Sequence, residues 1–130
     1  MIRKLDHVVI TTTQPEECLA FYEMLGFEAR PFGNRYSLVA GDFKINVHLY
    51  NSDRSTHTLH IRPGNSDFCF EIDEPITAFQ KRMQERLGAE LPIVERLGAR
   101  GVMQSIYLHD PDGNLVEVSS YDTPAPAGGR

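Results

Sequence analysis

The sequence predicts an α+β fold of two βαβββ modules, and an internal repeat is the main observation behind this prediction. An apolar run begins at His7, and Pro15 follows eight residues later; a similar run begins at Asp67, and Pro75 again follows eight residues later. Each proline opens a helical pattern that ends at a Leu-Gly pair, and strand-like runs come after it. This order predicts a curved, mostly antiparallel sheet with the two helices on its outer face.

In the first module, residues 5–12 alternate weakly and are rich in Val, Ile and Thr, which predicts a strand. Pro15 suits a first helical turn, the glutamates after it favour a helix N-terminus, and Gly26 is a suitable stop. Three short strands are predicted next, separated by Gly-Asn and Gly-Asp turns, over residues 27–32, 36–40 and 43–50.

The second module repeats this plan. Residues 67–72 predict a strand, and residues 75–87 a helix whose apolar positions recur at spacings of three and four: Ile76, Phe79, Met83 and Leu87. Strands are predicted over 91–97, 102–109 and 115–119. Between the last two lies the turn Asp110-Pro111-Asp112-Gly113, in which proline presets one dihedral angle and glycine accepts a positive φ.

We expect residues 1–121 to form a single domain. Module one covers about 3–50, a polar linker covers 51–66, and module two covers 67–121. Residues 122–130 are rich in Pro, Ala and Gly, which predicts a flexible tail.

The composition narrows the classes of function. A net charge of −5 argues against nucleic acid or an anionic membrane as a partner. No apolar run is long enough for a transmembrane helix, and the N-terminus lacks the apolar core of a signal peptide. Two cysteines, Cys18 and Cys69, are expected to be reduced and to pack as small buried residues. We therefore expect a cytoplasmic protein.

Four side chains that can bind metals recur in the two modules: His7 and His48 in the first, Asp67 and Glu117 in the second. Alternation along a strand places each of them opposite the most apolar face. A carboxylate such as Glu117, flanked by valines, is costly to bury without a partner or a metal. Taken singly, each histidine has a structural alternative and Asp67 suits a strand start, but together the four predict a metal site on the axis between the modules.

Other polar residues carry weaker predictions. Tyr50 and Tyr107 could hydrogen-bond a substrate or pack in the core, and Arg96, like Arg35, could meet an anionic substrate or form surface ion pairs. The remaining histidines, His57, His60 and His109, are expected to be solvated.

Three motifs resemble a known superfamily. They are Leu5-Asp6-His7-Val8, then Phe21-Tyr22 followed by Leu25-Gly26-Phe27, and finally Asp110-Pro111-Asp112-Gly113-Asn114-Leu115-Val116-Glu117-Val118. Over about residues 3–121 the chain resembles the vicinal oxygen chelate superfamily of glyoxalases, fosfomycin and bleomycin resistance proteins and extradiol dioxygenases. Within it, the chain most resembles small glyoxalase-domain-containing proteins, a branch that includes bacterial virulence-associated proteins.

This resemblance implies two modules around a central cavity, with His7, His48, Asp67 and Glu117 at the family's four ligand positions. Bacterial glyoxalase I carries His, Glu, His and Glu there, so the second and third places have exchanged type in this chain. With a divalent cation (Fe, Mn, Ni, Co or Zn) the net charge of the site would be near zero. If Asp67 does not bind, the other three form a two-histidine, one-carboxylate triad that suits oxygen activation.

The implied activity is that of a metal-dependent lyase, isomerase or dioxygenase that chelates a small substrate through adjacent oxygens. Glu117 is then either a ligand or a catalytic base. The alternative is a non-catalytic protein that binds a drug or metabolite, as bleomycin resistance proteins do. Superfamily members of this length are commonly homodimers, and we expect the same here.

Overall fold

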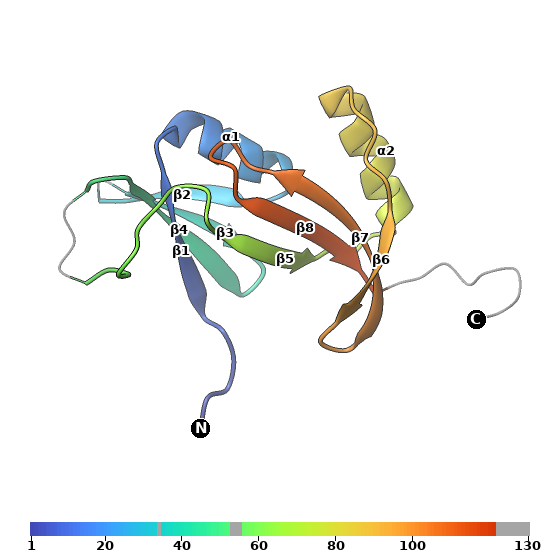
Figure 1. Ribbon diagram of the computed structural model, residues 1–130, viewed down its shortest axis with the longest axis horizontal. Helices are drawn as coiled ribbons and strands as arrows, with labels where there is room; N and C mark the ends of the chain where they lie inside the picture. Colours follow the sequence, from blue (N-terminus) through green and yellow to red (C-terminus); the bar gives the residue numbers. More distant parts are fainter. Residues whose placement is uncertain (34, 53–55, 122–130) are drawn as a thin grey trace, which may run out of the picture. The chain divides into compact units, whose positions relative to one another are not determined.

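The computed structural model describes residues 1–33, 35–52 and 56–121 (Figure 1); the predicted tail lies outside these residues. The order of elements is β-α-β-β-β, twice in succession, which confirms the two predicted βαβββ modules. The chain divides into two compact units, each with its own four-stranded sheet. The first unit comprises Met1–Ser66 and His109–Asn114, and the second comprises Asp67–Leu108 with the remainder of the chain.

The first sheet has the strand order β1-β4-β3-β2, in which β1 and β4 are parallel and the other neighbours antiparallel. Its elements lie close to the predicted ranges. They are β1 (His7–Thr12), α1 (Pro15–Met24), β2 (Glu28–Phe32), β3 (Arg35–Ala40) and β4 (Phe43–Leu49).

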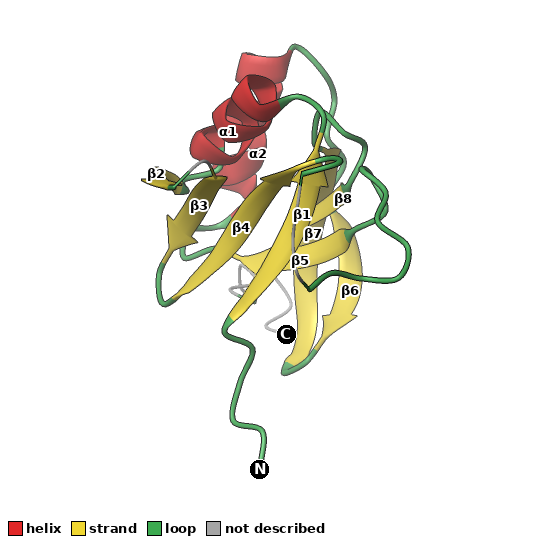
Figure 2. Ribbon diagram, turned by 90° about the vertical axis from the view of Figure 1, so that its left-hand side faces the viewer, coloured by secondary structure: helices red, strands yellow, loops and turns green. Residues whose placement is uncertain are grey.

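One face of this sheet packs against α1 (Figure 2). Ile10, Leu38 and Ile45 alternate with more polar neighbours and are almost completely buried, as the alternation predicts. Tyr22 of α1 is fully buried and meets Phe27 edge to face, with ring centroids 5.7 Å apart. The opposite face of the sheet, which carries His7, is the polar face of the first unit.

The segment His109–Asn114 belongs to the first unit, although it follows β7 in the chain. The buried carboxylate of Asp110 accepts hydrogen bonds from the Tyr22 hydroxyl at 2.7 Å and from the Asn114 side chain at 2.7 Å. Asp112 accepts hydrogen bonds from Thr13 at the start of α1, 3.0 Å from its backbone nitrogen. Gly113 has a φ of 94°, as the predicted turn requires.

The second sheet has the order β5-β8-β7-β6, with β5 and β8 parallel. Within α2, Ile76, Phe79 and Met83 are buried as predicted, whereas Leu87 in its last turn is 43% exposed. The elements are β5 (Asp67–Glu71), α2 (Ile76–Leu87), β6 (Val94–Gly98), β7 (Gly101–His109) and β8 (Leu115–Ser120). None of the helices in the described residues could span a membrane.

Candidate functional site

His7 opens β1 on the polar face of the first sheet, with its side chain 42% exposed. Its Nδ1 lies 2.8 Å from Oδ1 of Asp6. The hydrogen bond with His7 holds the pKa of the Asp6 carboxyl below its ordinary value. A carboxylate on Nδ1 fixes the tautomer of the ring and directs the lone pair of Nε2 outward, as in many metal-binding histidines.

His48 lies near the end of β4 and is buried, with 7% of its surface exposed. The register of the sheet separates it from His7. His7 is paired with Lys44, whereas His48 is paired with Thr11, four residues further along β1. At about 3.3 Å per residue, the backbones of the two histidines lie about 13 Å apart along the strand direction. The first sheet therefore does not bring the two predicted histidines together.

The second sheet spaces its predicted ligands more closely. Asp67 is paired with Leu115, and Glu117 follows two residues later on β8. In the first sheet His7 is paired with Lys44, and His48 follows Lys44 by four residues on β4. The prediction that His48 and Glu117 occupy equivalent positions of the repeat is therefore wrong. The equivalent residue is Asn46. Strand register depends on pairing between distant segments, which residue counts along the chain do not reveal.

Two hydroxyl groups hold the half-buried carboxylate of Glu117. Ser105 donates a hydrogen bond to its Oε2 at 2.7 Å, and Ser119 donates to the same oxygen at 3.2 Å. Both serines are fully buried. None of the described lysines and arginines forms an ion pair with Glu117.

A chain of hydrogen bonds continues from Glu117 to Cys69. The hydroxyls of Ser105 and Ser119 are 2.7 Å apart, and the Cys69 thiol lies 3.2 Å from the Ser119 oxygen. Cys69 is exposed rather than buried as predicted, because its position in β5 places it on the polar face beside Glu117. Burial of its sulfur and the charge of Glu117 both raise the pKa of this thiol.

Of the three residues predicted to bind substrate, Arg96 and Tyr107 form a contacting pair, whereas Tyr50 lies on a different strand end. Arg96 donates a hydrogen bond from Nε to the Tyr107 hydroxyl at 2.9 Å, and its guanidinium lies 5.4 Å from the centre of the Tyr107 ring. Tyr50 follows β4 and is 42% exposed, so it does not pack in the core. The predicted solvation of the described histidines outside the site, His57, His60 and His109, agrees with their exposure.

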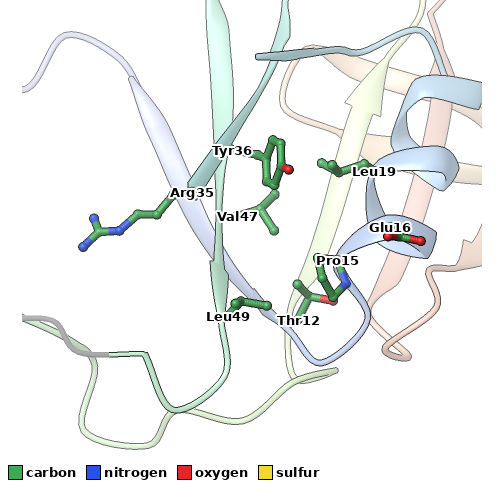
Figure 3. Close-up of a pocket in the computed structure, with 8 residues that line it drawn as sticks. All are labelled: Thr12, Pro15, Glu16, Leu19, Arg35, Tyr36, Val47 and Leu49. Carbon is green, nitrogen blue, oxygen red and sulfur yellow. The ribbon is translucent and has the colours of Figure 1, made fainter. Parts of the chain in front are cut away.

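A pocket of about 270 Å³ lies on the other face of the first sheet, between α1 and the strands (Figure 3). Leu19, Tyr36 and Val47 point toward its centre, whereas the Arg35 side chain points away. None of the predicted ligands lines this pocket. In the parts of the chain that the structure describes, no three His, Cys, Asp or Glu side chains lie together as a metal-binding group.

Sequence reasoning missed the groups that contact the candidate ligands, which are Asp6, Ser105 and Ser119. It also missed the contact between Ser37 and Asn46. Asp6 could have been found, because it is adjacent to His7 in the chain. No sequence pattern predicted the contacts of the serines. Ser37 and Ser105 contact residues of another strand, and Ser119 contacts Glu117 two residues before it on the same strand.

Comparison with known proteins gives a consistent result. The model of the Glyoxalase/Bleomycin resistance protein/Dioxygenase superfamily matches residues 4–118. The glyoxalase domain-containing protein RDO1 of Mycosarcoma maydis is 42% identical over 92% of this chain and 69% of its own length. Virulence protein STM3117 of Salmonella typhimurium is 39% identical over 93% of this chain and 86% of its own. The crystal structure of STM3117 matches with a TM-score of 0.86 over 93% of this chain and 98% of its own.

Proposed function

Because this chain belongs to the glyoxalase/bleomycin resistance protein/dioxygenase superfamily, we propose that it is a metal-dependent enzyme acting on a small substrate. The proposed reaction is glyoxalase-like, that of a lyase, isomerase or dioxygenase, and the substrate would present two adjacent oxygen atoms. The proposed ligands are His7, Asp67 and Glu117, with a fourth place that the sequence assigns to His48.

The environment of Glu117 is the observation that carries this proposal. A half-buried carboxylate without a lysine or arginine partner in the described residues is unfavourable unless another positive charge compensates it. A divalent cation would provide that charge, and the hydroxyl of Ser105 would orient the carboxylate toward it. The contact between Asp6 and His7 suits the same role on the other module. The residues present therefore fit the group that the family implies.

A bound divalent cation would act as a Lewis acid on the two substrate oxygens. The side chains of the site would orient the substrate and transfer protons. His7 would orient the site through its contact with Asp6, and Glu117 would either remain a ligand or accept a proton from the substrate. Arg96 and Tyr107, which contact each other, are the proposed groups for binding a polar part of the substrate. We propose a homodimer as the assembly, as is common in the superfamily.

Metal content, measured by mass spectrometry on untagged protein, tests this proposal. We expect about one divalent metal ion per chain in the wild type and its loss in His7→Ala and Glu117→Ala, because each removes a proposed ligand. Glu85→Ala is the matched control, since Glu85 is an exposed glutamate of α2 in the same unit as Glu117. A wild-type chain that takes up no Fe²⁺, Mn²⁺, Co²⁺, Ni²⁺ or Zn²⁺ would contradict the proposal.

That negative result would favour the second candidate function, a drug- or metabolite-binding protein of the bleomycin resistance type. The same family membership supports this alternative. Binding of small molecules to the metal-free chain, followed by calorimetry, would then be the decisive measurement.

A further inference from the structure

We infer that Asn46, rather than His48, supplies the fourth ligand of the proposed metal centre, through its side-chain oxygen. This inference rests on the proposed function. Its first support is the register of the two sheets. Asn46 lies two residues beyond the partner of His7, just as Glu117 lies two residues beyond the partner of Asp67. Asn46 and Glu117 are therefore equivalent in the repeat.

The second support is a contact that occurs in both units. In the first sheet Ser37 donates a hydrogen bond to Oδ1 of Asn46 at 3.2 Å. In the second sheet Ser105 donates to Oε2 of Glu117 at 2.7 Å. Both serines are buried, at 7% and 0% exposed, while Asn46 and Glu117 are half-buried. A buried hydroxyl that orients a ligand oxygen is a typical outer-shell contact of a metal site.

The reach of the side chains favours the same residue. Side chains of a strand stand roughly perpendicular to the sheet. Asn46 begins only about 7 Å further along the sheet than His7, whereas His48 begins about 13 Å further. A ligand atom must come within about 2 Å of the cation. His48 could meet this requirement together with His7 only if both rings lay along the sheet.

A ligand set with Asn46 in place of His48 changes which metal is expected. A set of His7, Asn46, Asp67 and Glu117 offers one imidazole nitrogen and three oxygens. The charge of its two carboxylates still balances a divalent cation. Oxygen-rich sets favour harder ions such as Mn²⁺ and Fe²⁺ relative to sets with two imidazoles.

Binding of Mn²⁺ alone to the metal-free full-length chain tests the inference, measured by the loss of the free-ion signal in electron paramagnetic resonance. We expect Asn46→Ala to weaken Mn²⁺ binding about tenfold or more, and Ser37→Ala to weaken it less. Asn46→Asp keeps the shape of the side chain and should retain or strengthen binding. His48→Gln is the matched control on the same strand and should change affinity less than about threefold.

The outcomes separate the inference from the proposed function. Loss of binding in His48→Gln with unchanged binding in Asn46→Ala and Asn46→Asp would overturn the inference and leave the metal centre standing. A wild-type chain that binds neither Mn²⁺ nor Fe²⁺ nor Zn²⁺ would overturn the proposed function itself. If Asn46→Ala fails to fold, the Mn²⁺ spectrum of Asn46→Asp decides. Exchanging an amide oxygen for a carboxylate oxygen on the ion alters the bound-ion signal, whereas a change at a distance from the ion does not.

Discussion

Hydroxyl groups set the environment of the two equivalent polar residues, Asn46 and Glu117. A serine hydroxyl has one proton to donate, and in the second unit Ser105 donates its proton to the Glu117 carboxylate at 2.7 Å. Ser105 can then only accept in its contact with Ser119, so the single Ser119 proton is shared between Ser105 at 2.7 Å and Oε2 of Glu117 at 3.2 Å. The Ser119 oxygen can accept from the Cys69 thiol.

The two cysteines should differ in reactivity. Burial first, and then the charges of Asp110 and Asp112, raise the pKa of the Cys18 thiol to about 12, and its side chain is fully buried. Since the thiolate is the reactive form, we expect iodoacetamide at pH 8 to label the exposed Cys69 and to leave Cys18 unmodified until the chain unfolds. Peptide mass spectrometry of native and urea-unfolded protein measures this. Equal labelling of both thiols in the native chain would contradict it.

The raised pKa of Cys18 also makes the free energy of unfolding depend on pH. The pKa of Cys18 is higher in the folded chain than its ordinary value of 9.0. Above pH 9 the unfolded chain releases the thiol proton while the folded chain keeps it, so the free energy of unfolding falls as the pH rises from 9 toward 12. Cys18→Ala removes this contribution to the pH dependence.

At the scale of elements, the connection from β7 to β8 contacts α1 at both ends, at the start through Thr13 and near the end through Tyr22. The Asp110 carboxylate accepts four hydrogen bonds, from Tyr22, from the backbone of Asp112, and from the backbone and side chain of Asn114. Gly64 also lies against this segment, with a φ of 83°, and a Cβ at this position would clash with the Asp112 carbonyl oxygen. The motif Asp-Pro-Asp-Gly-Asn is therefore a structural anchor as well as a turn.

Substitution of Asp110 should destabilise the folded chain. Asp110 is 4% exposed, so Asp110→Ala would leave several buried donors without an acceptor and should lower the free energy of unfolding by about 3 kcal/mol. Urea denaturation measures the change. Asp42→Ala is the control, because Asp42 is an exposed residue of the same unit whose ion pair with Lys4 contributes little. Equal effects of the two substitutions would contradict the anchoring role.

At the scale of the whole molecule, the family resemblance predicts assembly into a homodimer. The first unit exposes apolar side chains on β1 and directly after β4. Val9 is 41% exposed and Tyr50 42%. Exposed apolar residues that lie on neighbouring elements are typical of surfaces that bind another chain.

Sedimentation velocity tests this prediction. We expect a single species with the mass of two chains at micromolar concentration, and Val9→Asp should shift it toward one chain, because burying the new carboxylate at an interface is costly. Glu85→Lys, a change of charge on exposed α2, is the control. A wild type that sediments as one chain at every concentration would contradict the prediction.

The sequence by itself determined the local structure. The repeat, the prolines and the apolar spacing predicted every helix and strand to within a few residues, since these patterns reflect dihedral preferences and the burial of one face. Alternation likewise placed His7 and Glu117 opposite the apolar faces. Tertiary structure alone decided which residues become neighbours, because strand register depends on pairing between distant segments. It therefore made Asn46 the equivalent of Glu117, joined Asp110 to Tyr22, and exposed Cys69.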